Sequence, residues 1–148
     1  MDNNLERFIE VQKKEYHIAL SEIKNGYKVN HWMWYIFPQL KGLGTSAMSE
    51  FYGIEDFEEA KEYYNNEYLK NNLLEISNAL LELDNKIENI LGIPDNLKLQ
   101  SCMTLFELVD SKEKVFKEII DKFYDGKRDL KTINLLKYME TKNGKRTI

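Results

Sequence analysis

Apolar residues recur at three- and four-residue steps along most of this 148-residue chain, and this spacing constrains the fold more than any other feature. In the first segment they fall on one face of a helix expected from Asn4 to Lys24. The same period returns downstream, and no alternating pattern marks a pair of strands. The sequence therefore predicts an all-α fold, a compact single-domain bundle of about seven or eight helices with an aromatic loop after the first helix.

Capping residues and glycines predict where these helices begin and end. The later helices are expected over residues 46–52, 56–64, 66–83, 85–91, 94–109, 111–124 and 129–139. The expected caps are Asn3 or Asn4, Thr45 or Ser46, Asp56 with Glu59 as a capping box, and Ser111. We expect residues 1–140 to form one all-α domain and residues 141–148 a polar, basic tail that frays.

Composition limits the cellular compartments and the partners that such a chain can have. With 43% hydrophobic residues it can bury a core, and its net charge of −4 argues against general nucleic-acid binding. No apolar run approaches the roughly 20 residues of a membrane helix, and no basic stretch leads into an apolar one at the start. A lone cysteine, Cys102, suits a reducing compartment. We therefore expect a cytoplasmic protein without a signal peptide or a membrane partner.

One lysine lies on the inward, apolar side of its expected helix. The helix expected over residues 94–109 is apolar around most of its circumference, which is typical of a helix at the centre of a fold. Lys98 lies on its inward side, together with Ser101 and Thr104. Two interpretations stay open. Lys98 extends along apolar neighbours to the surface, or it projects into a cleft and binds an anion, with the two hydroxyls as further donors.

The segment of residues 31–39, His-Trp-Met-Trp-Tyr-Ile-Phe-Pro-Gln, follows neither period and holds both tryptophans of the chain. A short helix or an extended segment fits it equally well. It is either a hydrophobic plug across the core or a stacking platform for a planar ligand such as a nucleobase. In the second interpretation the ligand contacts are Trp32, Trp34 and Phe37, with His31 and Gln39 as polar ends.

A glycine-containing stretch follows at residues 41–46, Lys-Gly-Leu-Gly-Thr-Ser. It opens an expected helix, so its amides and Lys41 could hold a phosphate. It lacks the Gly-Lys-Ser/Thr ending of a P-loop, and no strand precedes it as in a dinucleotide fingerprint. Such a stretch is more often a turn with a helix cap.

Four stretches of this sequence are familiar together: Leu5-Glu-Arg-Phe-Ile-Glu-Val-Gln, His31-Trp-Met-Trp-Tyr-Ile-Phe-Pro-Gln-Leu-Lys-Gly-Leu-Gly, Tyr52-Gly-Ile and Asp95-Asn-Leu-Lys-Leu-Gln-Ser-Cys-Met-Thr-Leu-Phe. The chain resembles, over about residues 5–136, the bacterial family called domain of unknown function 1810, whose members often carry a misleading calpastatin label. The resemblance implies a compact all-α fold and no established activity. Cys102 stands where the family more often has serine. The positions that follow the family pattern are His31, Trp32, Trp34, Pro38, Gln39, Lys98, Ser101 and Thr104.

Several kinds of chemistry have little support. His17 and His31 are the only histidines, and no metal-ligand spacing includes them or Cys102, although a carboxylate-only magnesium site stays open. A thiol in the middle of a buried helix is usually inert. A Ser101–Lys98 dyad, or acid–base work near His31 by Glu50, Glu55 or Asp56, is less favoured than a packing or capping role. We expect no cofactor and no metal.

Three hypotheses remain. In the first, the protein binds or sequesters a small anionic, ring-containing ligand of the nucleotide or ADP-ribose/NAD-derived type, with the tryptophans stacking and Lys98 and Lys41 neutralising phosphate. In the second, it hydrolyses a glycosidic or phosphate bond of such a ligand through His31 or a carboxylate. In the third, it is a helical interaction module without a ligand. We favour the first because it needs neither a nucleophile nor a metal. It requires Lys98 and residues 31–39 to share a cavity, and it leaves homo-oligomer formation open.

Overall fold

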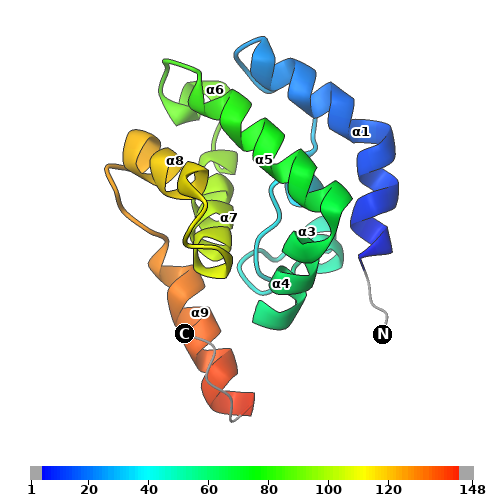
Figure 1. Cartoon of the computed structure of the whole chain (residues 1–148), viewed down its shortest axis with the longest axis vertical. Helices are drawn as coiled ribbons and strands as arrows, with labels where there is room; N and C mark the ends of the chain where they lie inside the picture. The colour runs from blue at the N-terminus through cyan, green and yellow to red at the C-terminus, as the bar shows by residue number, and fades with distance from the viewer. Residues whose placement is uncertain (1–4, 144–148) are drawn as a thin grey trace.

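The computed structural model describes residues 5–143, and every regular element in that range is an α-helix (Figure 1). In chain order these are α1 (Glu6–Lys24), α2 (Met33–Ile36), α3 (Ala47–Tyr52), α4 (Phe57–Asn65), α5 (Glu67–Leu81), α6 (Ile87–Leu91), α7 (Asp95–Val109), α8 (Lys114–Tyr124) and α9 (Leu130–Asn143). The all-α prediction is confirmed. The described part holds nine helices rather than seven or eight, because part of the aromatic segment forms α2. Within it, no helix is long and apolar enough to cross a membrane.

Local capping bonds begin several helices where the sequence predicts them. The side chains of Ser46 and Asp56 accept hydrogen bonds from the backbone N–H three residues ahead, at 3.1 and 2.9 Å, and so begin α3 and α4. The capping box at α4 closes differently from the expected form. The Glu59 carboxylate accepts from the N–H of Glu55, one residue before the cap, at 2.8 Å.

Two expected helix ends are corrected. Ser111 does not cap α8: Asp110 organises a turn there by accepting from the N–H groups of Lys112 and Glu113, and the Glu113 side chain caps the helix instead. The last helix continues beyond the expected residue 139 to Asn143. The expected caps Asn3 and Asn4 and residues 144–148 of the expected tail lie outside the described residues.

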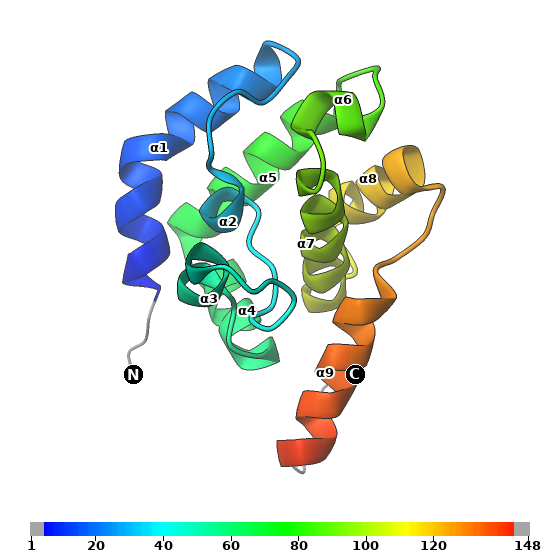
Figure 2. The ribbon, with the colours of Figure 1, turned by 180° about the vertical axis from the view of Figure 1, so that it is seen from behind.

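Helix α7 occupies the centre of the bundle, as its apolar circumference predicts. It packs against α4, α6, α8 and α9, and Figure 2 shows it between α8 and the α3–α4 pair. Its buried residues lie all around the helix: Leu99, Ser101, Cys102, Met103, Thr104, Leu105 and Phe106. Any polar group on its inner side must therefore find a partner within the fold or face a cavity.

The segment after α1 crosses the interior between α1 and α7 (Figure 2). Trp32, Met33, Ile36 and Phe37 are almost completely buried in it. Beyond α2, the chain is tied to the residues after α3 by a short parallel bridge between Leu40 and Ile54, with hydrogen bonds of 2.8 and 2.9 Å. This bridge fixes the loop that carries Gln39 beside α7.

Candidate functional site

The two tryptophans of the aromatic segment have different environments. Trp32 is fully buried, and its indole N–H donates to the Glu22 carboxylate of α1 at 2.8 Å. Trp34 is only partly buried, and its indole N–H meets no acceptor among the described residues. The stacking role expected for Trp32 is therefore corrected, because no ligand reaches the face of a fully buried ring. The Trp34 side chain, in contrast, is partly exposed to solvent.

Glu22 completes the closed environment of Trp32. Its carboxylate also accepts the backbone N–H groups of Val29 and Asn30, at 2.7 and 3.0 Å. Desolvation acts to raise the pKa of Glu22, but these hydrogen bonds to the ionised form outweigh it and lower the pKa below its ordinary value. Glu22 thus fastens residues 29–32 to α1.

Asp95, in the first turn of α7, lies between two lysines. Its carboxylate is 2.9 Å from the Lys28 ammonium and 3.5 Å from the Lys98 ammonium. Each ammonium also lies over a tryptophan ring: Lys28 is 5.2 Å from the centroid of Trp32, and Lys98 is 5.1 Å from that of Trp34. Lys98 and the aromatic segment do meet, and of the two lysines Lys98 has the looser ion pair.

Lys98 and Gln39 line two adjoining hollows. One, which we call the Trp34 crevice, has a volume of only about 10 Å³ and also includes Trp34 and Phe37. The other, which we call the Lys98 cleft, has a volume of about 390 Å³ and an open mouth. The Lys98 cleft is lined by Gln39, Leu43, Gly44, Pro94, Leu97, Lys98, Gln100, Ser101, Asp129 and Lys131. Its size is within the range of about 300–1,000 Å³ that is usual for small-molecule sites.

The loop wall of the Lys98 cleft is tightly packed at Gly44 and polar at Gln39. A Cβ atom at Gly44 would lie 2.5 Å from the Ser49 hydroxyl oxygen, so only glycine fits there. The side-chain amide of Gln39 forms no hydrogen bond with another described residue. The Gln39 amide can therefore both donate a hydrogen bond to a ligand and accept one from it.

The hydroxyls of Ser101 and Thr104 have other roles than the one expected. Ser101 donates to the Asp129 carboxylate at 2.7 Å, and Thr104 is fully buried and accepts the backbone N–H of Asp129 at 2.9 Å. Both therefore position Asp129, which lies just before α9 and lines the Lys98 cleft. Asp129 is not among the residues that the sequence predicts for the site. Its only sequence signal is that of a helix cap, and its approach to α7 spans 28 residues of chain.

Three other expected site residues lie elsewhere. His31 is exposed and lines neither the Lys98 cleft nor the Trp34 crevice. Phe37 is buried and reaches only the crevice. Lys41 points to the other side of its loop, where its ammonium pairs with the Glu55 carboxylate at 3.0 Å. Its expected phosphate role beside Lys98 is therefore corrected, because the Leu40–Ile54 bridge holds it next to the segment after α3.

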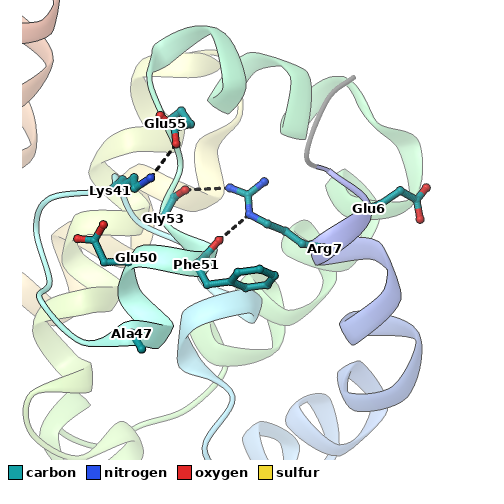
Figure 3. Close-up of a pocket in the computed structure, with 8 residues that line it drawn as sticks. All are labelled: Glu6, Arg7, Lys41, Ala47, Glu50, Phe51, Gly53 and Glu55. Carbon is teal, nitrogen blue, oxygen red and sulfur yellow. Dashed lines mark hydrogen bonds and ion pairs between the residues drawn. The ribbon is translucent and has the colours of Figure 1, made fainter. Parts of the chain in front are cut away.

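The cavity that Lys41 lines has a volume of about 570 Å³ and is shown in Figure 3. Arg7 lines this cavity, and its guanidinium donates to the carbonyls of Phe51 and Gly53, both at 2.8 Å. It also forms an ion pair with the Glu59 carboxylate. Its cations, Arg7 and Lys41, thus have internal partners (Figure 3). This cavity is wide and exposed, and its polar contacts join α1 to the end of α3.

Neither an accessible thiol nor a cluster of three metal-ligating side chains occurs among residues 5–142. Cys102 is fully buried in α7, and burial raises the pKa of its thiol well above the ordinary value, so it stays protonated. Among residues 5–142, no group of three or more His, Cys, Asp or Glu side chains is arranged to hold a metal ion.

Comparison with known proteins identifies relatives of the chain but indicates no activity. The conserved hypothetical protein Rv1873 from Mycobacterium tuberculosis, known from a crystal structure, has a similar fold, with a TM-score of 0.88 and 39% sequence identity. The match covers 90% of this chain and 96% of that one. No curated protein matches the chain. A family model described as "Protein of unknown function (DUF1810)" matches residues 2–136, and the chain belongs to this family.

Proposed function

We propose that the protein binds or sequesters a small anionic, ring-containing ligand of the nucleotide or ADP-ribose/NAD-derived type in the Lys98 cleft. The observation that carries the proposal is the position of the Lys98 ammonium. It lies over Trp34 in the wall of a ligand-sized cleft, and its one ion pair is a loose 3.5 Å contact. We propose that this binding takes place in the cytoplasm, since a lone cysteine suits a reducing compartment.

The charges around Asp95 favour an anion. Two ammonium groups, of Lys28 and Lys98, share one carboxylate, so this cluster keeps one positive charge without a partner. Lys131 also lines the Lys98 cleft, and its positive charge offsets the negative charge of Asp129 there. A partly buried cation attracts phosphate more strongly than an exposed one, because less water screens the pair. Lys98 is therefore the main contact for the ligand's phosphate.

The rest of the cleft suits a ring. Leu43, Pro94 and Leu97 form an apolar part of the lining, and Leu97 is 55% exposed. An apolar wall with a few polar groups is the usual composition of a small-ligand site. Trp34 contributes mainly by holding the ammonium over its face, rather than by stacking on the ligand as first expected.

Binding is better supported than hydrolysis. A hydrolase that used His31 would need this side chain within reach of the ligand, and His31 lines neither hollow around Lys98. Binding uses only groups that face the cleft. We therefore propose a binding protein, and we expect a bound nucleotide to be recovered chemically unchanged after the protein is denatured.

Calorimetry with adenosine 5′-monophosphate (AMP) and adenosine tests the proposal. The Lys98→Met variant removes the charge and keeps a flexible side chain over Trp34, while Lys112→Met removes an exposed charge on the turn between α7 and α8. We expect the wild type and Lys112→Met to bind AMP clearly more tightly than adenosine. In Lys98→Met, AMP should bind about tenfold or more weakly, the usual effect of losing a charge-assisted hydrogen bond.

Two results would contradict the proposal. The first is that neither AMP nor ADP-ribose binds the wild type. The second is that Lys98→Met binds AMP as tightly as Lys112→Met does. Chromatography of the ligand after incubation gives a separate readout, because a changed product would show turnover in place of binding.

A further inference from the structure

Asp129 gives the Lys98 cleft a fixed hydrogen-bond acceptor. One of its carboxylate oxygens, Oδ2, accepts the hydroxyls of Ser101 and Thr132, at 2.7 and 2.6 Å, and the backbone N–H of Thr132 at 3.2 Å. Its own backbone N–H donates to Thr104. Asp129 is thus held by both α7 and α9 before any ligand arrives, and such preorganisation lowers the cost of binding.

The other oxygen, Oδ1, accepts no hydrogen bond from the described residues. A carboxylate has about four lone-pair positions, and those on Oδ1 have no partner among the described residues. A carboxylate suits the start of α9, because negative charge is stabilised at a helix N-terminus, but the capping bonds use only Oδ2 and leave Oδ1 available. The cleft therefore combines a cation, Lys98, with an acceptor that can only receive hydrogen bonds.

We propose that Asp129 accepts the hydroxyl groups of the ligand's sugar, so that the site takes ribosyl phosphates in preference to 2-deoxyribosyl phosphates. This inference rests on the proposed function. An anionic ligand must keep its phosphate near Lys98 and away from the Asp129 carboxylate, and it must offer Oδ1 a donor. Ribose offers two adjacent hydroxyls, and carboxylates recognise ribose hydroxyls in this way in dinucleotide-binding proteins. Ser101 and Thr104 act as positioning residues through their bonds to Asp129.

A site built to bind a hydroxyl discriminates against a ligand that lacks it, because its own polar group then stays unpaired. We therefore expect the wild type to bind AMP about tenfold or more tightly than 2′-deoxyadenosine 5′-monophosphate. Ribose 5-phosphate and 2-deoxyribose 5-phosphate should show the same order without a base. Calorimetry measures both pairs.

The Asp129→Asn variant isolates the free oxygen. The asparagine carbonyl can still accept from Ser101 and Thr132 and cap α9, while its amide replaces Oδ1 by a donor. We expect a variant that folds as the wild type does, with a melting temperature lower by only a few degrees because the charge at the start of α9 is lost, and a ribo-to-deoxy preference that falls close to one. Ser101→Ala is a second variant. It keeps the carboxylate but removes one positioning bond, and it should reduce the preference only in part.

The outcomes separate this inference from the proposed function. If AMP and its deoxy analogue bind the wild type equally, and both lose affinity in Lys98→Met, the anion site stands and the role of Asp129 is refuted. A preference that survives in Asp129→Asn also refutes it. If neither compound binds the wild type, the proposed function and this inference both fail. A preference that disappears in Asp129→Asn, while the variant stays folded and still binds both phosphates, supports the inference.

Discussion

Two lysine–tryptophan pairs flank the same carboxylate, yet they belong to different parts of the molecule. Lys28 lies over Trp32 and Lys98 over Trp34, at nearly equal distances, and both lysines contact Asp95. The first pair is closed: its ring is fully buried and its indole N–H is bound to Glu22. The second pair borders a cleft, and its indole N–H has no acceptor among the described residues.

The difference shows that residue types alone do not identify a binding site. A lysine over a tryptophan is part of the core where every polar atom has a partner. It becomes a candidate site where the ammonium lacks a close ion pair and the ring is partly exposed. Lys28 has a side chain only 7% exposed and a close ion pair, while Lys98 is 22% exposed with a looser one. Hydrogen-bond satisfaction and access to solvent therefore distinguish the two pairs.

Replacing each tryptophan by alanine should give the largest contrast. Trp32→Ala removes a fully buried ring and should lower the free energy of unfolding by about 3–5 kcal/mol. Trp34→Ala removes a partly exposed ring together with an unpaired N–H, so we expect a loss of only about 1–2 kcal/mol. Urea denaturation measures both. Equal losses would show that Trp34 is as much a core residue as Trp32.

Replacing each lysine by methionine should lower the free energy of unfolding in the same order, Lys28 more than Lys98, but by smaller amounts. Lys28→Met leaves the half-buried Asp95 carboxylate with only its 3.5 Å partner and should cost about 1–3 kcal/mol of unfolding free energy. Lys98→Met should cost less than about 1 kcal/mol, because its pair is longer and more exposed. The same denaturation measurement applies. A large loss in Lys98→Met would assign Lys98 a structural role in place of ligand binding.

Lowering the pH should destabilise the region of the Lys28–Trp32 pair, because the Glu22 carboxylate that binds Trp32 becomes protonated. Because its pKa in the folded protein lies below the ordinary value of 4.5, ionised Glu22 stabilises the fold. This contribution is complete above the unfolded pKa and is lost as the pH falls through the lowered folded pKa. The stability difference between the wild type and Glu22→Gln should be about 1 kcal/mol at pH 7 and should shrink below about pH 4.5. A difference that stays constant from pH 7 to pH 3 would contradict this account.

Much of the fold is predictable because its signals are local. The bounds of α7 agree with the expected range, and Ser46 and Asp56 cap their helices through bonds to residues three positions away. The sequence does not decide between a helix and an extended segment at α2, because the apolar residues there follow no period. Burial on all sides removes the pattern that separates a short helix from an extended segment.

The candidate site was predictable only in part. Lys98, Trp34 and Gln39, which line the hollows, stand out in the sequence because Lys98 is a charge on an apolar helix and the other two belong to an aromatic segment without a period. Asp129 and Lys28 were missed because they join the site through contacts across 28 and 67 residues of chain. Ser101 was assigned to the ligand for the same reason, since its true partner is distant in sequence.

The two indole N–H groups offer the most direct test of the central claim, because each gives its own signal in a nuclear magnetic resonance spectrum of ¹⁵N-labelled protein. Titration with AMP should shift the Trp34 signal, which lies under Lys98, and leave the Trp32 signal, bound to Glu22, in place. In Lys98→Met the shift of Trp34 should require a much higher concentration of AMP. Signals of both tryptophans that stay unchanged at saturating AMP, or a response of Trp32 alone, would contradict a ligand site at Lys98.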